Sequence, residues 1–148
     1  MNSTQQSDSV IISALRRGGY KATPQRIEIC RSVLGCREHP SAQKIYGKVK
    51  KAYPTVSLAT IYKTLEILKE LGMLQELSIP QGQARLDPNM NLHINMICLQ
   101  CGKIIDSDSE SLQEDLKRVA AEAKFSTALQ RIDIYGKCEK CAVSRKPS

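Results

Sequence analysis

Residues 57–72 read SLATIYKTLEILKELG, and this stretch decides the fold of the first half of the chain. Ser57 is a favoured residue at a helix start and Gly72 at a helix end, so the pattern predicts one helix between them. Apolar residues recur every three or four positions, as they do on the buried face of an amphipathic helix. These residues are Leu58, Ile61, Leu65, Leu68 and Leu71.

Three shorter helices are expected before this one, from apolar periodicity and start signals. Their expected starts are Asp8, Thr23 followed by Pro24, and Ser41. The second of them carries Cys30 on its apolar face, and we expect this thiol to be a small core residue.

A hairpin is expected after the long helix. Two strand-like runs, 73–77 and 83–86, flank the turn residues Pro80, Gln81 and Gly82. Helices followed by a two-stranded hairpin make a winged helix-turn-helix, whose second helix enters the DNA major groove. Residues 1–87 are therefore predicted to be a winged-helix DNA-binding domain.

The charge distribution agrees with a nucleic-acid partner for this half. Residues 1–87 hold 13 basic and 7 acidic side chains, whereas residues 88–148 hold 9 and 8. A basic module attached to a near-neutral one is typical of proteins that bind nucleic acid through one part.

Several side chains are candidates for contact with double-stranded DNA. On the long helix, the aromatic ring of Tyr62 can press on a thymine methyl group, and Lys63 can reach a base or the backbone. The same outward face includes Thr64, which we expect to be exposed. Basic residues elsewhere would contact phosphates. The candidate set is Lys21, Arg26, Ser57, Ala59, Thr60, Tyr62 and Lys63.

The second half has a different pattern. Runs 95–98, 103–106 and 131–135 are typical of strands, and the spacing of Leu112, Leu116, Val119 and Ala123 indicates a helix between the last two. A β-β-α-β unit of this size is too small to be comfortably stable alone, so metal binding and a homodimer are expected. The fold class is α+β, with residues 88–148 as a small zinc-bound dimerisation and metal-binding domain.

Four cysteines form two Cys-x-x-Cys pairs, each beside a glycine. They are Cys98, Cys101, Cys138 and Cys141. Two such turns complete a tetrahedral Cys₄ zinc site of the structural kind. Two redox pairs or two disulfides are the alternatives, but a redox pair normally opens a helix in a βαβ unit, whereas the first pair here lies between strand-like runs.

The sequence has no apolar run long enough to cross a bilayer and no signal segment at its start, which predicts a cytoplasmic protein without membrane contact. Reduced thiols in that compartment favour metal binding. Zinc closed by four thiolates performs no chemistry, and no Ser/His/Asp set or phosphate-binding glycine loop is visible. We therefore expect a protein that is not an enzyme; a thiol oxidoreductase is the alternative from another class, ahead of a zinc hydrolase.

Together these segments resemble the ferric uptake regulator family of metal-dependent repressors. The resemblance covers nearly the whole chain and is carried by six motifs. They are GYKATPQR (19–26), HPSA (39–42), VSLATIY (56–62), His93 five residues before Cys98, ICLQCGKIID (97–106) and YGKC (135–138).

The resemblance implies a regulatory metal held by residues of both domains. The matching ligand positions are His39, Asp87, His93, Asn95 and Asp106. Many members have a second histidine where Asn95 stands, and its amide oxygen is a weaker ligand than imidazole. Mixed nitrogen and oxygen ligands suit Fe²⁺ or Mn²⁺, while the thiolates retain Zn²⁺.

Aspartate at positions 87 and 106 resembles the peroxide-sensing branch of the family, in which iron-catalysed oxidation modifies ligand histidines matching His39 and His93. The expected function is a homodimeric, metal-dependent repressor that binds a palindromic operator and senses peroxide. The alternative within the family is an iron-responsive repressor of metal uptake without peroxide sensing; a zinc or manganese regulator ranks below it.

Overall fold

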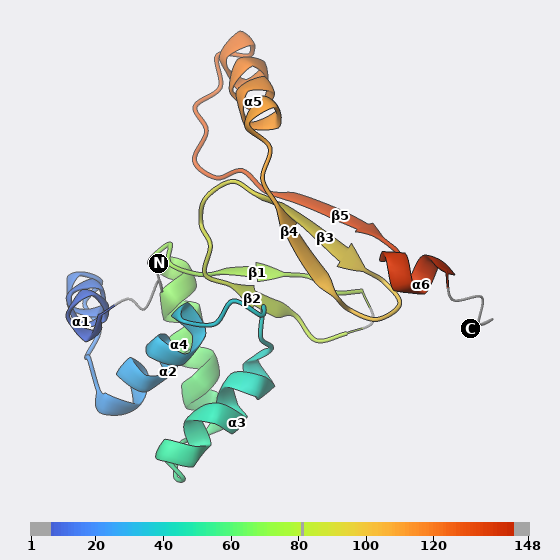
Figure 1. Ribbon diagram of the computed structural model, residues 1–148. Helices are drawn as coiled ribbons and strands as arrows, with labels where there is room; N and C mark the ends of the chain where they lie inside the picture. The colour runs from blue at the N-terminus through green and yellow to red at the C-terminus, as the bar shows by residue number, and fades with distance from the viewer. Residues whose placement is uncertain (1–6, 81, 144–148) are drawn as a thin grey trace. The chain divides into compact units, whose positions relative to one another are not determined.

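The structure is a computed structural model, and it describes residues 7–80 and 82–143. The chain divides into two compact units, Met1–Met90 and Asn91–Ser148. Helices dominate the first unit and a three-stranded sheet dominates the second (Figure 1). The terminal tails and Gln81, one of the three expected turn residues, lie outside the described residues.

In the described part of the first unit there are four helices, and three of them begin at the expected caps. They are α1 (Asp8–Arg17), α2 (Pro24–Leu34), α3 (Ala42–Ala52) and α4 (Leu58–Glu70). The side chains of Thr23, Ser41 and Ser57 each accept a hydrogen bond from a backbone N–H in the first turn of the following helix. Each such cap contributes about 1 kcal/mol of stability. After α4 the chain turns at Gly72, whose φ of +70° favours glycine.

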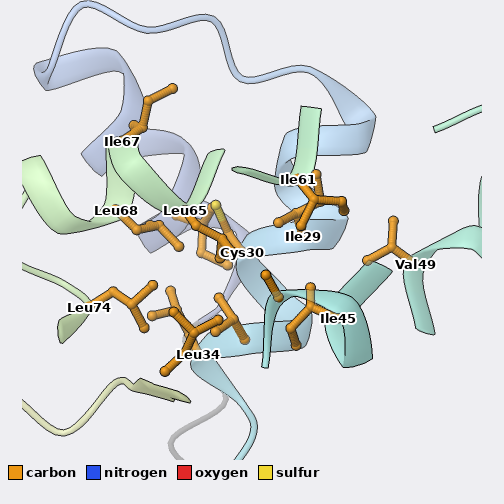
Figure 2. Packing of buried hydrophobic residues seen from close by; sticks show 14 of the residues in the cluster. Ile29, Cys30, Leu34, Ile45, Val49, Ile61, Leu65, Ile67, Leu68 and Leu74 are labelled. Atoms are coloured by element: carbon orange, nitrogen blue, oxygen red, sulfur yellow. The ribbon is translucent and has the colours of Figure 1, made fainter. Parts of the chain in front are cut away.

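One apolar core holds these helices together. Helix α2 packs against α1, α3 and α4, and α3 packs against α4. Figure 2 shows Cys30 among apolar side chains such as Leu34, Ile45 and Leu65. Cys30 has no exposed surface, as expected for a core thiol. Each fully buried leucine or isoleucine contributes about 1.5–3 kcal/mol by leaving water.

The expected hairpin is present but short. Strand β1 (Gln75–Leu77) pairs antiparallel with β2 (Arg85–Asp87), which completes the winged helix-turn-helix. The second strand is also tied to the loop between α2 and α3. The Arg85 side chain donates to the His39 carbonyl at 2.8 Å, and the Leu86 N–H donates to the Pro40 carbonyl at 2.9 Å.

Two details of α4 differ from the prediction. Thr64, expected to face outward, is fully buried; its hydroxyl donates to the Thr60 carbonyl at 2.8 Å, so burial leaves no unsatisfied donor. Leu58, expected on the core face, is exposed; it is the first residue of α4, and burial on this face begins one turn later, at Ile61. Ile61, Leu65 and Leu68 are buried as predicted.

The second unit contains the predicted β-β-α-β order. Its elements are β3 (Ile94–Cys98), β4 (Ile104–Ser107), α5 (Glu110–Glu122) and β5 (Ile132–Gly136), followed by α6 (Glu139–Val143), which the sequence did not predict. The strand order is β4-β3-β5, with β3 antiparallel to β4 and parallel to β5 (Figure 1). The parallel pairing requires the crossover through α5.

Helix α5 has no buried residue, although its sequence is amphipathic. Val119 on this helix and Ile134 on β5 are more than half exposed, as are Phe125 and Leu129 in the segment between them. Several large apolar side chains exposed on one small unit mark an interaction site more often than free surface.

Candidate metal centres and nucleic-acid interface

The four thiols predicted to bind zinc converge on one point. Their Sγ atoms all lie within 4.8 Å of one another, and those of Cys101 and Cys138 are 3.7 Å apart. Thiolates about 2.3 Å from a tetrahedral zinc ion lie about 3.8 Å from each other. All four cysteines are free of disulfides. One closed cluster, rather than two separate redox pairs, fits a structural zinc ion.

The parallel pairing of β3 and β5 explains why the two pairs meet. Cys98 ends β3 opposite Gly136 of β5, so both Cys-x-x-Cys turns lie at the same end of the sheet. The Leu99 N–H donates to the Gly136 carbonyl at 2.8 Å, and the Cys138 N–H donates to Cys98 Sγ at 3.3 Å. Gly102 has a φ of +74°, a conformation that allows the first turn to close.

The surroundings of the thiols favour the thiolate form at two of the four. Backbone N–H groups, first that of Cys101 and then that of Cys138, lower the pKa of Cys98 to about 6. The pKa of Cys138 is lowered as well, mainly by the backbone N–H of Cys141. Cys141 donates within the cluster, chiefly to Cys138, and its pKa rises to about 12. Thiolate is the form that ligates metal.

Two of the expected regulatory ligands meet within the first unit. His39 Nε2 lies 3.8 Å from Asp87 Oδ2, and both side chains are buried. This distance is too long for a hydrogen bond, but two ligands held about 2.1 Å from one ion are separated by about 3–4 Å. The other oxygen of Asp87, Oδ1, accepts from the Asn89 N–H at 2.9 Å, which fixes the carboxylate.

The other three expected ligands belong to the second unit. His93 Nδ1 lies 2.7 Å from the Asn91 carbonyl. Because a carbonyl only accepts, Nδ1 carries the proton, and the lone pair of the neutral imidazole is on Nε2. Asn95 on β3 lies opposite Asp106 of β4 in the antiparallel register, and Asp106 is exposed.

Asn95 has an unusual environment for an amide. It is 2% exposed, and within the described residues its Oδ1 atom has no hydrogen-bond partner. A buried acceptor without a partner costs about 1–3 kcal/mol, and native proteins have few. An orphaned buried oxygen next in register to a carboxylate fits a divalent cation with oxygen and nitrogen ligands. The donors within each unit therefore suit the Fe²⁺ or Mn²⁺ expected from the sequence.

One residue near this site was missed. Asp133 on β5 accepts a hydrogen bond from Asn95 Nδ2 at 3.1 Å. The sequence predicted both strands, but it did not reveal that residues 95 and 133 are neighbours. Alternation of polar side chains in the run 131–135 was the available signal.

The candidate DNA-contacting residues of α4 lie at its N-terminal end. Ser57, Ala59, Tyr62 and Lys63 are exposed, and Thr60 is partly exposed. Gln43 of α3 donates to the Tyr62 hydroxyl at 3.0 Å, which fixes the ring while leaving it 43% exposed.

The two basic candidates near α2 are linked to each other. The Arg26 guanidinium donates to the Lys21 carbonyl at 3.0 Å, so it orders the segment that carries the exposed Lys21 side chain.

Among the described residues, no helix combines the length and apolar character needed to cross a bilayer.

Comparisons with known proteins agree with this architecture. Residues 17–135 match the model of the Ferric uptake regulator family. The peroxide-responsive repressor PerR of Staphylococcus aureus is 36% identical over 130 residues, which are 88% of each chain. The crystal structure of the Campylobacter jejuni peroxide stress regulator has a TM-score of 0.72 at 30% identity, over 88% of this chain and 98% of that one.

A third relative supports the fold alone. The Helicobacter pylori ferric uptake regulator, described as having three functional metal binding sites, has a TM-score of 0.80 at 20% identity, over 99% of this chain and all of that one. The winged helix-turn-helix, the cysteine cluster and the match over most of the sequence lead to one conclusion: the chain belongs to the ferric uptake regulator family.

Proposed function

We propose that this chain is a homodimeric, metal-dependent transcriptional repressor that responds to peroxide in the cytoplasm. Residues 1–87 bind a palindromic operator in double-stranded DNA, with α4 in the major groove, and residues 88–148 bind metal and dimerise. The observation that carries the proposal is the buried His39–Asp87 pair, because it puts two metal-binding side chains in the same unit as the DNA-reading helix.

Structural zinc is assigned to the cysteine cluster. Cys98, Cys101, Cys138 and Cys141 join the turn after β3 to the segment after β5 at one end of the sheet, and four thiolates leave no position open for a substrate. Their role is therefore stability, and regulation belongs to the other set of ligands.

The regulatory metal, Fe²⁺ or Mn²⁺, is assigned to His39, Asp87, His93, Asn95 and Asp106. Because these ligands come from both units, metal binding favours one arrangement of the two, and its free energy is coupled to DNA affinity. Fe²⁺ held by these ligands would activate hydrogen peroxide, which is the two-electron oxidant. The imidazole of His39 or His93 would be the group oxidised: it would gain one oxygen atom from the peroxide, and the second peroxide oxygen would leave as water. The modified imidazole would bind metal poorly, and the repressor would dissociate from DNA.

The dimer is supported by the apolar surface of the second unit. Strand β5 is at an edge of the sheet, and Ile134 on it is half exposed. Val119 of α5 is exposed as well. These exposed apolar groups and the edge strand suit contact with a second copy of the chain, since unpaired edge strands and apolar patches are otherwise prone to aggregation.

The decisive experiment loads zinc-containing protein anaerobically with Fe²⁺ or Mn²⁺ and adds dilute hydrogen peroxide. We expect a gain of one oxygen on the peptide containing His39 or His93 in the Fe²⁺ form, together with loss of operator binding in fluorescence anisotropy. The Mn²⁺ form serves as the control and should keep its mass and its DNA affinity. An unmodified Fe²⁺ form that remains bound to the operator would rule out peroxide sensing.

A second candidate is an iron-responsive repressor without oxidative chemistry. It is favoured by Asn95, because an amide in place of imidazole changes the environment of the bound iron. This function predicts metal-dependent operator binding in the same assay, with no mass change after peroxide.

A further inference from the structure

We propose that Asp133 is a positioning residue for the regulatory cation. It holds the Asn95 amide so that the oxygen, and not the nitrogen, is presented to the metal. The inference rests on the proposed metal site and adds a residue outside the five expected ligands. It explains how an asparagine can serve at a position where related chains use imidazole.

The sheet brings three polar side chains into one row. β3 is the central strand, and Asn95 lies opposite Asp106 of β4 on one side and Asp133 of β5 on the other. Residues directly opposite on neighbouring strands project from the same face of a sheet. Asn95 is therefore flanked by a carboxylate on each side.

The hydrogen bond between Asn95 and Asp133 fixes which end of the amide faces which way. Asn95 Nδ2 donates to Asp133 Oδ1 at 3.1 Å. An ionised carboxylate only accepts hydrogen bonds, so the reversed amide would put two oxygens against each other. Asn95 Oδ1 must point away from Asp133, and it is the buried oxygen without a hydrogen-bond partner in the described part of the chain.

Asp133 itself is held by a third residue. Its Oδ2 atom lies 3.1 Å from a guanidinium nitrogen of Arg131, and the Asp133 side chain is only 19% exposed. Both carboxylate oxygens thus have partners, one on Asn95 and one on Arg131. This makes Asp133 a residue that orients a ligand, as second-layer hydrogen bonds orient the ligands of many metal sites.

The arrangement has a consequence for metal choice. An amide oxygen is a harder donor than imidazole, and carbonyl and carboxylate oxygens suit Mn²⁺ more than Zn²⁺. The Arg131–Asp133–Asn95 chain therefore tunes the site toward hard divalent cations, and it does so only while the amide is kept in one orientation.

The test measures Mn²⁺ binding to zinc-loaded protein by the loss of the free Mn²⁺ signal in electron paramagnetic resonance. Asp133→Asn keeps the shape of the side chain but lets the pair of amides adopt either orientation. We expect its Mn²⁺ affinity to fall by about tenfold, the lower end of the usual effect of losing such a partner. Asp115→Asn, which removes an equal charge from the surface of α5, should leave the affinity unchanged.

A rescue variant separates orientation from charge. The double substitution Asn95→Asp with Asp133→Asn exchanges the two groups, keeps their hydrogen bond and the net charge, and again presents an oxygen to the metal. We expect its affinity to be within about threefold of the wild type, and this comparison stands even if Asp133→Asn alone loses zinc. Wild-type affinity in Asp133→Asn, or a tenfold loss in the exchanged pair, would overturn the inference.

Failure of the proposed metal-dependent function can be distinguished from failure of the role assigned to Asp133. If the wild-type protein with one zinc per chain bound no Mn²⁺ at all, the proposed regulatory site itself would be wrong. If the wild type bound Mn²⁺ and Asp133→Asn bound it equally well, only the role of Asp133 would be lost.

Discussion

His39 and Asp87 are 48 positions apart in the sequence, yet His39 Nε2 lies 3.8 Å from Asp87 Oδ2 in a buried part of the first unit. Strand β2 brings them together: its Leu86 N–H and its Arg85 side chain both donate to carbonyls of the loop before α3. His39 has a φ of +50°, a conformation that is uncommon for residues with a side chain and is found at functional sites more often than elsewhere.

We predict that His39→Ala weakens metal-dependent operator binding by more than about tenfold while leaving the weak metal-free binding unchanged. The reason is that a ligand is lost from the site whose occupancy favours the DNA-binding form. Anisotropy titrations with and without Mn²⁺ measure both quantities. Glu38→Gln, which changes an exposed neighbour paired with Lys44, is the matched control. Equal loss in the metal-free titration would indicate misfolding instead of ligand loss.

Cys138→Ser should abolish zinc binding and unfold the second unit. Structural zinc contributes about 10–16 kcal/mol in small zinc-folded domains, more than a unit with so few buried side chains can replace. Zinc content and far-ultraviolet circular dichroism measure the effect. Cys36→Ser should retain one zinc per chain and a normal spectrum. A Cys138→Ser protein with full zinc content would refute the four-thiol site.

Cys30 should be inert to alkylation in the native protein. Burial raises the pKa of the Cys30 thiol from 9.0 to about 12, so almost no thiolate exists at pH 8. In zinc-loaded protein treated with iodoacetamide at that pH, peptide mass spectrometry should find Cys36 modified and Cys30 unmodified. Labelling of both at one rate would contradict this expectation.

The same shift gives a stability effect in alkali. The folded-state pKa of Cys30 is above its unfolded value, so the folded state binds the proton more tightly. This contribution is fully present below about pH 9 and is lost as pH rises toward 12. In urea unfolding of zinc-loaded protein, Cys30→Ala should therefore show a shallower decline over that range than the wild type does. Parallel declines would argue against a buried, neutral thiol.

Lys63→Gln should weaken binding to all DNA sequences about equally and should reduce the slope of log K against log salt by about one, the effect of one lost phosphate contact. Anisotropy at several salt concentrations measures the slope. Lys117→Gln, an exposed substitution on α5, should not change it. An unchanged slope with altered preference among operators would mean that Lys63 reads a base instead.

Ile134→Glu should convert the dimer into monomers, because it places a charge on the exposed apolar surface of β5. Light scattering after size-exclusion chromatography measures the mass. Val10→Glu, an equally exposed apolar position on α1 of the first unit, is the control and should remain dimeric. A dimeric Ile134→Glu protein would mean that the dimer forms through a different surface.

The helices of the first unit were predictable because short local motifs determine where they begin. Thr23, Ser41 and Ser57 cap the helices at the expected positions, since a cap depends on only a few neighbouring residues. Burial depends on partners distant in sequence. A helical pattern is equally compatible with a buried or an exposed side chain at Leu58 and at Thr64, and only the packed structure shows which one is buried.

The same difference between local and distant information applies to the candidate metal sites. The cysteine cluster was predictable because Cys-x-x-Cys spacing is local and each pair binds from one turn. Asp133 was not, because its relation to Asn95 depends on which strands pair and in which register. The parallel partner of a strand is separated from it by a whole crossover helix, and periodicity carries no information about that choice.

The parallel pairing of β3 with β5 also determines when the zinc site can form during synthesis. During synthesis the whole apolar core of the first unit leaves the ribosome early, and N-terminal units generally fold first. Cys98 and Cys101 are synthesised about forty residues before Cys138 and Cys141, because the crossover through α5 lies between the two pairs. A nascent chain truncated anywhere in α5 would contain the complete first unit together with Cys98 and Cys101, but it would lack the other two thiols that the zinc site needs.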